Sequence, residues 1–163
     1  MKKSNSIRER IFNPEEISQE VRRLRLKSKT IAFTNGVFDI LHEGHIAVLS
    51  KAAAFADVLI VGVNSDSSVR KLKGDSRPIN KEDSRALILA SLIMVDAVVI
   101  FNEETPIELI KIIEPDILIK GGDYTIDTIV GAKEVLVAGG KVEVIPLEEG
   151  YSTTGIINKI SAK

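Results

Sequence analysis

Short apolar runs alternate with longer mixed segments along the 163-residue chain. Five of these runs are apolar on both sides, without the polar alternation of a half-exposed strand, and they predict buried strands. The predicted strands are TIAFTN (30–35), DVLIVGVN (57–64), AVVIF (97–101), DILIK (116–120) and VEVIP (142–146).

The segments between these runs carry helix signals. Asn13 and Pro14 begin a predicted helix over 14–28, because asparagine caps a helix and proline fits its first position. Further predicted helices occupy about 45–55, 80–93, 105–114 and 127–138, and a last one follows Ser152. Five strands that are buried on both faces and separated by helices predict one three-layer α/β/α domain with a parallel sheet.

Three polar or glycine-rich segments follow predicted strands. They are TNGVFD after the first strand, VNSDSS after the second and KGGDY after the fourth. Parallel sheets bind ligands beyond the carboxyl ends of their strands, where the strand order reverses. If the first and fourth predicted strands are neighbours, TNGVFD and KGGDY face each other across one crevice.

The only two histidines of the chain, His42 and His45, lie within GVFDILHEGH (36–45). A helix that starts near Gly44 would present free N–H groups to an anion, and the glycine would let a phosphate approach the backbone. The imidazoles could then donate hydrogen bonds to phosphoryl oxygens. Two alternatives stay open: buried histidines that only fill space, or a zinc site with Asp39, although this spacing is not a typical zinc motif.

Two further segments favour phosphate chemistry. Six basic residues lie between 70 and 85 in a chain of net charge −1, which suits a polyphosphate better than duplex nucleic acid. They are Arg70, Lys71, Lys73, Arg77, Lys81 and Arg85. The hydroxyl run in EEGYSTTGII (148–157) could cap the last helix or hold the outer phosphates of a nucleotide.

The composition excludes several classes. Without cysteine there are no disulfides, thiolate zinc sites or cysteine nucleophiles, which fits a reducing compartment. The charged N-terminus is not followed by the apolar run of a secretory signal. The longest apolar stretch, 86–101, is broken by Asp96 and too short to span a bilayer comfortably. We expect a cytoplasmic protein that binds neither nucleic acid nor membranes.

Four segments of the chain together resemble the cytidylyltransferase-like nucleotidyltransferase superfamily. They are FTNGVFDILHEGH, VNSDSSVRKLKGDSRPIN, KGGDY and EEGYSTTGIINKI. The closest resemblance is to the adenylyltransferase domain of ADP-heptose synthase, over residues of about 30 to 160. It implies a Rossmann-like sheet of order 3-2-1-4-5 and ATP as substrate with Mg²⁺. The implied reaction is direct in-line transfer of AMP to a sugar 1-phosphate, D-glycero-β-D-manno-heptose 1-phosphate, which gives ADP-heptose and pyrophosphate.

The resemblance also assigns roles to residues. His42, His45 and Lys73 are expected to act on the phosphates during transfer. The residues expected to bind the nucleotide are Thr34, Asn35, Gly36, Val37, Phe38, Gly44, Gly122, Asp123, Tyr124, Ser152, Thr153 and Thr154. Those expected near the acceptor are Asp39, Asn64, Lys71, Arg77 and Lys120. No dedicated metal ligand is expected.

Some features depart from the family pattern. Val37 stands where many members carry a hydroxyl residue, so only a backbone contact with phosphate is expected there. Leu147 replaces an arginine of the glycerol-phosphate cytidylyltransferases, which leaves the pyrophosphate clamp to Lys71, Lys73, Arg77 or Lys120. Residues 1–28 are poorly covered, so the expected division is an N-terminal helical extension over 1–28 and a nucleotidyltransferase domain over 29–163.

Other functions stay open on sequence alone. A relative with another acceptor, such as an FAD synthase or a glycerol-3-phosphate cytidylyltransferase, would share these motifs, as would a nucleotide-binding sensor that has lost catalysis. Heptose enzymes of this kind are often fused to a sugar kinase, and a separate kinase is expected here. The segment 1–28 could serve packing or subunit contact, the latter in a homodimer.

Overall fold

The computed structural model describes residues 6–146 and 153–161. Within them, one fully parallel sheet has the order β1-β4-β3-β2-β5-β6. Its strands are β1 (Ile11–Phe12), β2 (Ile31–Gly36), β3 (Val58–Asn64), β4 (Ala97–Phe101), β5 (Ile117–Gly121) and β6 (Lys141–Ile145). The five predicted strands occur in the expected 3-2-1-4-5 order. The expected number was wrong, because β1 pairs with β4 and adds a sixth strand.

The helices largely follow the predictions. They are α1 (Pro14–Leu26), α2 (Glu43–Ala53), α3 (Asp66–Lys73), α4 (Glu82–Ala90), α5 (Ile107–Ile113), α6 (Ala132–Val137) and α7 (Thr153–Ser161), with the short 3-10 helices η1 (Arg8–Arg10) and η2 (Ile126–Thr128). The Asn13 side chain accepts a bond from the Glu16 N–H, and the Glu16 carboxylate accepts one from the Asn13 N–H, both at 2.9 Å. This capping box fixes the start of α1 where the sequence predicts it.

Two helix predictions were wrong. A single helix over 127–138 does not form, because Gly131 adopts a φ of +85° between η2 and α6. A Cβ at that position would lie 2.4 Å from the Ile110 Cδ1 atom, so the turn requires glycine. The second difference is α3, a helix that was not predicted and that begins within the polar segment VNSDSS after β3.

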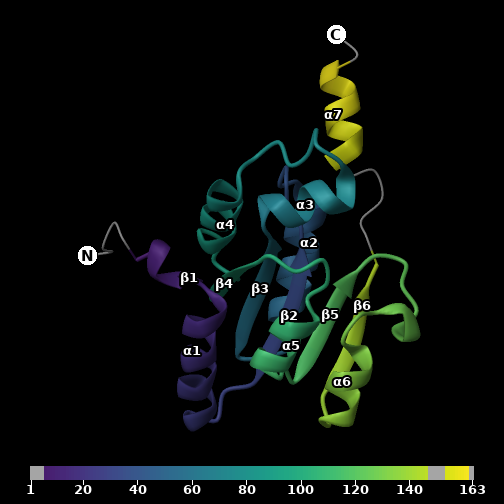
Figure 1. Cartoon of the computed structure of the whole chain (residues 1–163). Helices are drawn as coiled ribbons and strands as arrows, with labels where there is room; N and C mark the ends of the chain where they lie inside the picture. Colours follow the sequence, from purple (N-terminus) through teal and green to yellow (C-terminus); the bar gives the residue numbers. More distant parts are fainter. Residues whose placement is uncertain (1–5, 147–152, 162–163) are drawn as a thin grey trace.

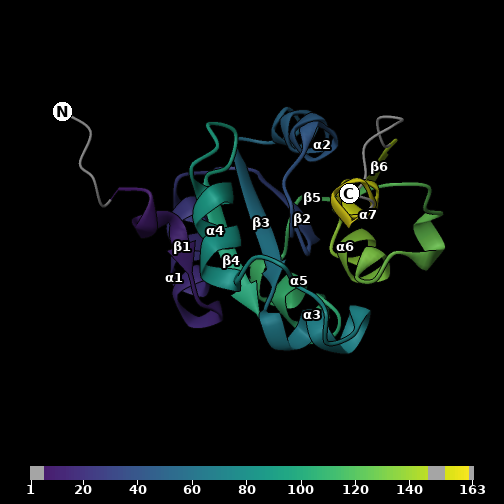
Figure 2. The ribbon, with the colours of Figure 1, turned by 90° about the horizontal axis from the view of Figure 1, so that it is seen from above.

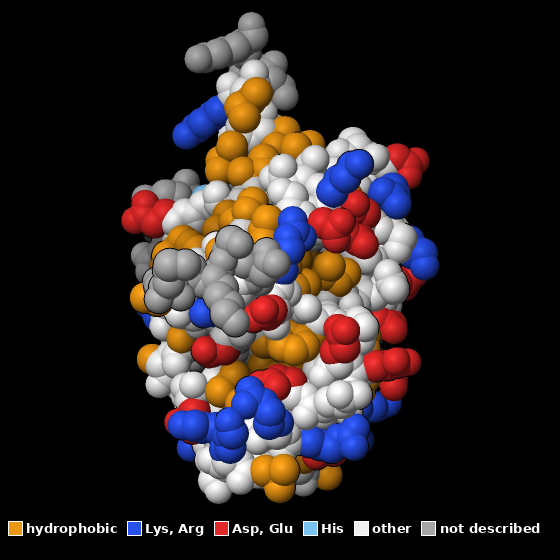
Figure 3. Space-filling model, turned by 90° about the vertical axis from the view of Figure 1, so that its left-hand side faces the viewer, with side chains coloured by type: hydrophobic (Ala, Val, Ile, Leu, Met, Phe, Trp, Pro, Cys, Tyr) orange, Lys and Arg blue, Asp and Glu red, His pale blue; other side chains and the backbone are white. Residues whose placement is uncertain are grey.

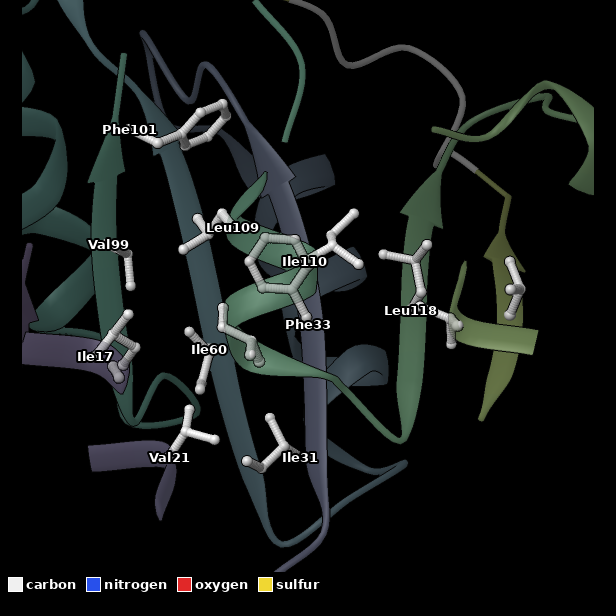
Figure 4. Packing of buried hydrophobic residues seen from close by; sticks show 14 of the residues in the cluster. Ile17, Val21, Ile31, Phe33, Ile60, Val99, Phe101, Leu109, Ile110 and Leu118 are labelled. Atoms are coloured by element: carbon white, nitrogen blue, oxygen red, sulfur yellow. The ribbon is translucent and has the colours of Figure 1, made fainter. Parts of the chain in front are cut away.

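Helices cover both faces of the sheet, as Figures 1 and 2 show, with α2 and α5 on opposite sides. One core cluster joins α1, α5 and α6 to one face of the strands, and the other joins α2 and α4 to the opposite face. Figure 4 shows the first cluster, where Leu109 and Ile110 of α5 lie beside the Phe33 ring of β2, and Ile17 of α1 lies beside Val99 of β4. This packing confirms the three-layer class.

The N-terminal segment takes part in these layers. β1 lies at the edge of the sheet, and α1 contributes Ile17, Val21 and Leu24 to the core. The domain boundary after residue 28 stays a prediction. On the face that carries this segment, side chains of both charges are interspersed with apolar ones (Figure 3). No helix in the described part of the chain is long and apolar enough to cross a membrane.

Candidate active site

The centre of the site lies at the carboxyl end of β2. The chain runs from β2 outward through β3 and β4 on one side, and then crosses to β5 and β6 on the other. Thr34 pairs with Val61 of β3 and with Ile119 of β5, so β2 is the strand at which the order reverses. The loops after β2 and β5 therefore flank one crevice, the usual place for a ligand in this class of fold.

Both histidines lie where the loop after β2 enters α2. His42 is the N-cap residue, and its backbone N–H donates to Nδ1 of His45 at 3.3 Å. The two rings stack with their centroids 3.9 Å apart, and the Phe38 ring lies 5.3 Å from His45 on a tilt. Because Nδ1 of His45 accepts a hydrogen bond, the ring proton belongs on Nε2. His45 is thus held in the tautomer that offers a donor away from its own backbone.

The charge state of His45 follows from its surroundings. Burial, with smaller contributions from repulsion by His42 and Lys73, lowers the pKa of His45 to about 4. Burial also lowers the pKa of His42. His45 is therefore a neutral imidazole near pH 7, and it can donate from Nε2 without carrying a charge. Lys73, at the C-terminal end of α3, supplies positive charge to the same site.

The loop between β2 and α2 has little freedom. Phe38 adopts a left-handed conformation with a φ of +49°, which turns its ring toward His45. A Cβ at Gly36 would lie 3.1 Å from this ring, so a side chain there would push against it. Gly44 is buried in the first turn of α2, and Val37 is half-buried. The arrangement fits a backbone-lined phosphate seat.

The segments TNGVFD and KGGDY, at the ends of β2 and β5, lie side by side, as the sequence predicts for neighbouring strands. The Lys120 Nζ atom donates to Oδ1 of Asn35 at 3.3 Å and lies 5.6 Å from the centre of the Tyr124 ring. Burial lowers the pKa of Lys120. Gly122 makes the turn beyond β5 with a φ of +130°, and Asp123 is exposed. Lys120 thus places a basic group at the carboxyl ends of β2 and β5.

Asp39 has a different environment from the one expected. Its carboxylate accepts hydrogen bonds from the N–H groups of Ile79 (2.8 Å) and Asn80 (2.8 Å) and from Nε of Arg77 (2.7 Å). Burial alone would raise the pKa of Asp39, but these bonds outweigh it and hold the pKa below its usual value. An acceptor substrate or a zinc ion would have to compete with these partners for the Asp39 carboxylate. No contact in the structure therefore supports the predicted role of Asp39 or Arg77 in binding the acceptor substrate.

The remaining predicted residues have varied environments. Asn64 is buried, and its Nδ2 atom donates to Oγ of Ser68 at 3.0 Å, which points it into the start of α3. Lys71 is exposed on α3. Thr153 begins α7, and its hydroxyl donates to the Ile40 carbonyl at 3.4 Å, so α7 starts next to the loop after β2. Ser152 and Leu147 lie outside the described residues, and the side chain of Thr154 is likewise not described.

Three polar residues form a network around the loop after β2 that was not predicted. Arg85 was counted among the basic residues suited to a polyphosphate, and this interpretation was wrong because Arg85 is buried and bonded within the protein. Arg85 of α4 is buried and donates to the Val37 carbonyl, and Asp66 and Glu82 continue this network toward α3. A signal was available, because Arg85 stands beside Ala86, Leu89 and Ala90 on the buried face of its helix. A charged residue on such a face needs partners.

Across residues 6–146 and 153–161, no group of three or more His, Asp or Glu side chains is placed to hold an ion. Asp39, the carboxylate on the loop that leads to the two histidines, is engaged by the 77–80 segment. The donor set therefore does not form a protein cage for Mg²⁺.

The sequence profile of the cytidylyltransferase-like family matches residues 33–159, which include both histidines and the segments after β2 and β5. The chain belongs to the cytidylyltransferase-like family. It is 50% identical to the bifunctional protein HldE of Caulobacter vibrioides over 94% of this chain and 32% of that protein. It is 57% identical to the bifunctional protein HldE of Campylobacter jejuni subsp. doylei over 86% of this chain and 30% of that protein. The chain thus spans about a third of the length of these relatives.

Two solved structures have a similar fold. A lipopolysaccharide core biosynthesis protein from Thermoplasma volcanium matches with a TM-score of 0.59 and 28% identity, over 76% of this chain and 99% of that one. Pantoate-beta-alanine ligase from Francisella tularensis, solved with an ATP analogue and β-alanine, matches with a TM-score of 0.64 and 21% identity, over 94% of this chain and 78% of that one. The second likeness concerns the fold alone. As a member of its family, this chain is a nucleotidyltransferase.

Proposed function

We propose that the protein transfers AMP from ATP to D-glycero-β-D-manno-heptose 1-phosphate and produces ADP-heptose and pyrophosphate. The observation that carries the proposal is the His42–His45 pair at the N-terminus of α2, with its donor on Nε2 of His45. Such a donor suits a phosphorus centre on which negative charge builds up during displacement. Two findings support heptose 1-phosphate as the acceptor: the motifs resemble ADP-heptose synthase, and the chain is 50% and 57% identical in sequence to two HldE proteins.

The match to a lipopolysaccharide core biosynthesis protein at 28% identity supports the same pathway. In the proposed reaction an oxygen of the sugar 1-phosphate attacks the α-phosphorus of ATP and forms the new P–O bond. The bond from this phosphorus to the oxygen shared with the β-phosphate breaks, and pyrophosphate takes the electron pair. The attacking oxygen is already anionic, so no general base is needed. The protein contributes positioning and charge stabilisation.

Each part of the crevice has a proposed task. The N–H groups at the start of α2 and the Nε2–H of His45 would face the α-phosphate. Lys73 and Lys120 would neutralise charge on the phosphates of the two substrates, and Tyr124 would border the base and ribose. Thr153, next to the loop after β2, would meet the outer phosphates. Mg²⁺ would enter with ATP and be held by the phosphate oxygens, and no step here depends on a protein-bound metal.

The deciding experiment pairs each nucleoside triphosphate with each acceptor and follows pyrophosphate release. The acceptors are heptose 1-phosphate, glycerol 3-phosphate and FMN. We expect turnover with ATP and heptose 1-phosphate that exceeds every other pair by at least about tenfold in kcat/KM. Turnover with CTP and glycerol 3-phosphate, or with ATP and FMN, in place of this pair would refute the acceptor. No release with any pair, together with tight ATP binding, would favour a nucleotide-binding sensor.

A further inference from the structure

Arg85 is a charged side chain with almost no access to solvent. It is 1% exposed, and it lies on the face of α4 that also buries Ala86, Leu89 and Ala90. A guanidinium in such a position cannot lose its proton and is stable only if its donors find partners. Its place in the interior therefore depends on the groups that it binds.

The three hydrogen bonds of Arg85 reach three different segments. Nη1 donates to the Val37 carbonyl at 2.6 Å, in the loop that follows β2. Nε donates to the Asn80 carbonyl at 2.9 Å, just before α4, and Nη2 donates to Oδ1 of Asp66 at 2.8 Å, in the first turn of α3. Because the guanidinium is planar and rigid, it fixes these segments relative to one another.

A second set of bonds links the same three segments. The Glu82 carboxylate accepts the backbone N–H of Asp66 at 2.5 Å, which joins the start of α4 to the start of α3. Asp39, two residues after Val37, accepts the N–H groups of Ile79 and Asn80. The nucleotide-side loop after β2, helix α3 and the 77–80 segment are thus cross-linked around one buried arginine. We call Arg85, Asp66, Glu82 and the carbonyls of Val37 and Asn80 the Arg85 network.

This network connects groups that meet different substrates in the proposed reaction. The loop after β2 leads into the histidine pair, and α3 carries Lys73 at its far end, whose charge is felt at His45. We infer that Arg85 is a positioning residue that keeps the phosphate seat of the nucleotide aligned with the 77–80 segment and with α3, whose Lys73 is proposed to act on the substrate phosphates. It touches neither substrate. The inference rests on the proposed function for the identity of the substrates, but not for the linkage of the segments.

The test replaces Arg85 by lysine, which keeps the charge but cannot bind the three segments together. We expect Arg85→Lys to lower kcat by about 10- to 100-fold, because small misplacements of reacting groups cost this much. The KM values for ATP and for the acceptor should change less than threefold, since no group that contacts a substrate is lost. A kcat within twofold of wild type, or a loss confined to KM, would overturn the inference.

A matched control exists at the other end of the sheet. Arg25 donates to the Glu114 carbonyl at 2.6 Å and to the Asp116 carboxylate at 2.5 Å, near the amino ends of β2 and β5. Arg25→Lys should lower thermal stability and leave kcat unchanged. If Arg85→Lys does not fold, Asp66→Ala is the second variant, because it removes the bond between Arg85 and α3 at a partly exposed position. It should also lower kcat with little change in KM, and the fall in kcat should be smaller than in Arg85→Lys.

Hydrogen exchange on the ligand-free protein tests the linkage without any substrate. In Arg85→Lys we expect faster exchange at 37–39, 66–73 and 77–80 together, by at least about tenfold, with no such change in Arg25→Lys. If the three segments keep their wild-type exchange, or if only one of them changes, the inference fails even if the enzyme is active. If instead wild type releases no pyrophosphate with heptose 1-phosphate, the proposed acceptor fails, while the exchange result decides the role of Arg85 by itself.

Discussion

The tautomer of His45 leads to a sharp prediction about three substitutions at one position. Nδ1 accepts the His42 N–H, and Nε2 carries the proton that would face the phosphate. An asparagine amide reaches about as far as Nδ1, and a glutamine amide reaches about as far as Nε2. His45→Asn can therefore keep the bond to the backbone without supplying the donor, whereas His45→Gln can supply the donor and loses the backbone bond. His45→Ala loses both.

The expected sizes follow from these contacts. One well-placed donor to a developing charge is worth about 3–4 kcal/mol, so His45→Ala should lower kcat by about 10²- to 10³-fold. His45→Asn should lose as much activity as alanine but keep more of the helix start, which a cap stabilises by about 1 kcal/mol. His45→Gln should retain activity within about tenfold to thirtyfold of wild type. ATP affinity should change little in all three variants.

The assay is pyrophosphate release at saturating substrates, with ATP binding measured by calorimetry and stability by urea unfolding. The ring contacts of His45 with His42 and Phe38 are lost in every variant, so they cannot explain a difference among the three. If asparagine retains more activity than glutamine, the catalytic proton lies on the other ring nitrogen. If all three variants stay near wild-type activity, His45 has no part in the chemistry.

Three further predictions concern stability. The pKa of about 4 for His45 lies below the ordinary 6.5, so the contribution of His45 to stability is complete above pH 6.5 and is lost as the pH falls toward 4. Over this pH range, urea unfolding should show that wild type loses about 1–2 kcal/mol more stability than His45→Asn, after allowance for solvent screening. An equal loss in the two proteins would contradict this prediction. Gly62→Ala should cost about 1–3 kcal/mol, because the new Cβ would lie 2.9 Å from the Phe33 ring, and an unchanged urea midpoint would refute this clash. Asp39→Ala should lower the free energy of unfolding by about 3–5 kcal/mol, because it leaves the mostly buried Arg77 without its carboxylate partner. Calorimetric melting tests this prediction, and a loss below about 1 kcal/mol would contradict it.

Much of the sheet could be predicted because its strands are buried on both faces. Runs such as DVLIVGVN have no polar alternation, and this pattern indicates parallel strands under helices. The order of the strands came from the resemblance to a family and not from periodicity. β1 could not be predicted, because a strand of two residues has no period and depends on its pairing with Val98 and Val99.

The site was predicted in part for similar reasons. GVFDILHEGH combines a strand end, two glycines and two histidines, so this motif can be recognised from the local sequence. Helix α3 was missed because its segment is polar, with only Ser68 and Val69 buried. The partners of Asp39 and Arg85 lie between 5 and 48 residues away along the chain, and no local pattern pairs them. Tertiary contacts of this kind follow from the fold and not from any short motif.

The position of β2 in the sheet also has a consequence for the order in which the molecule assembles. β2 can pair with β3 as soon as residues 58–64 are available, but it meets β5 only through residues 117–119. Contacts between such distant segments form slowly, because long loops must close first. During synthesis on the ribosome, β2 and β5 can therefore form the crevice only after residues 117–119 have been made. The proposed catalytic centre therefore forms late in folding, and we expect substrates to find no binding site in earlier folding intermediates.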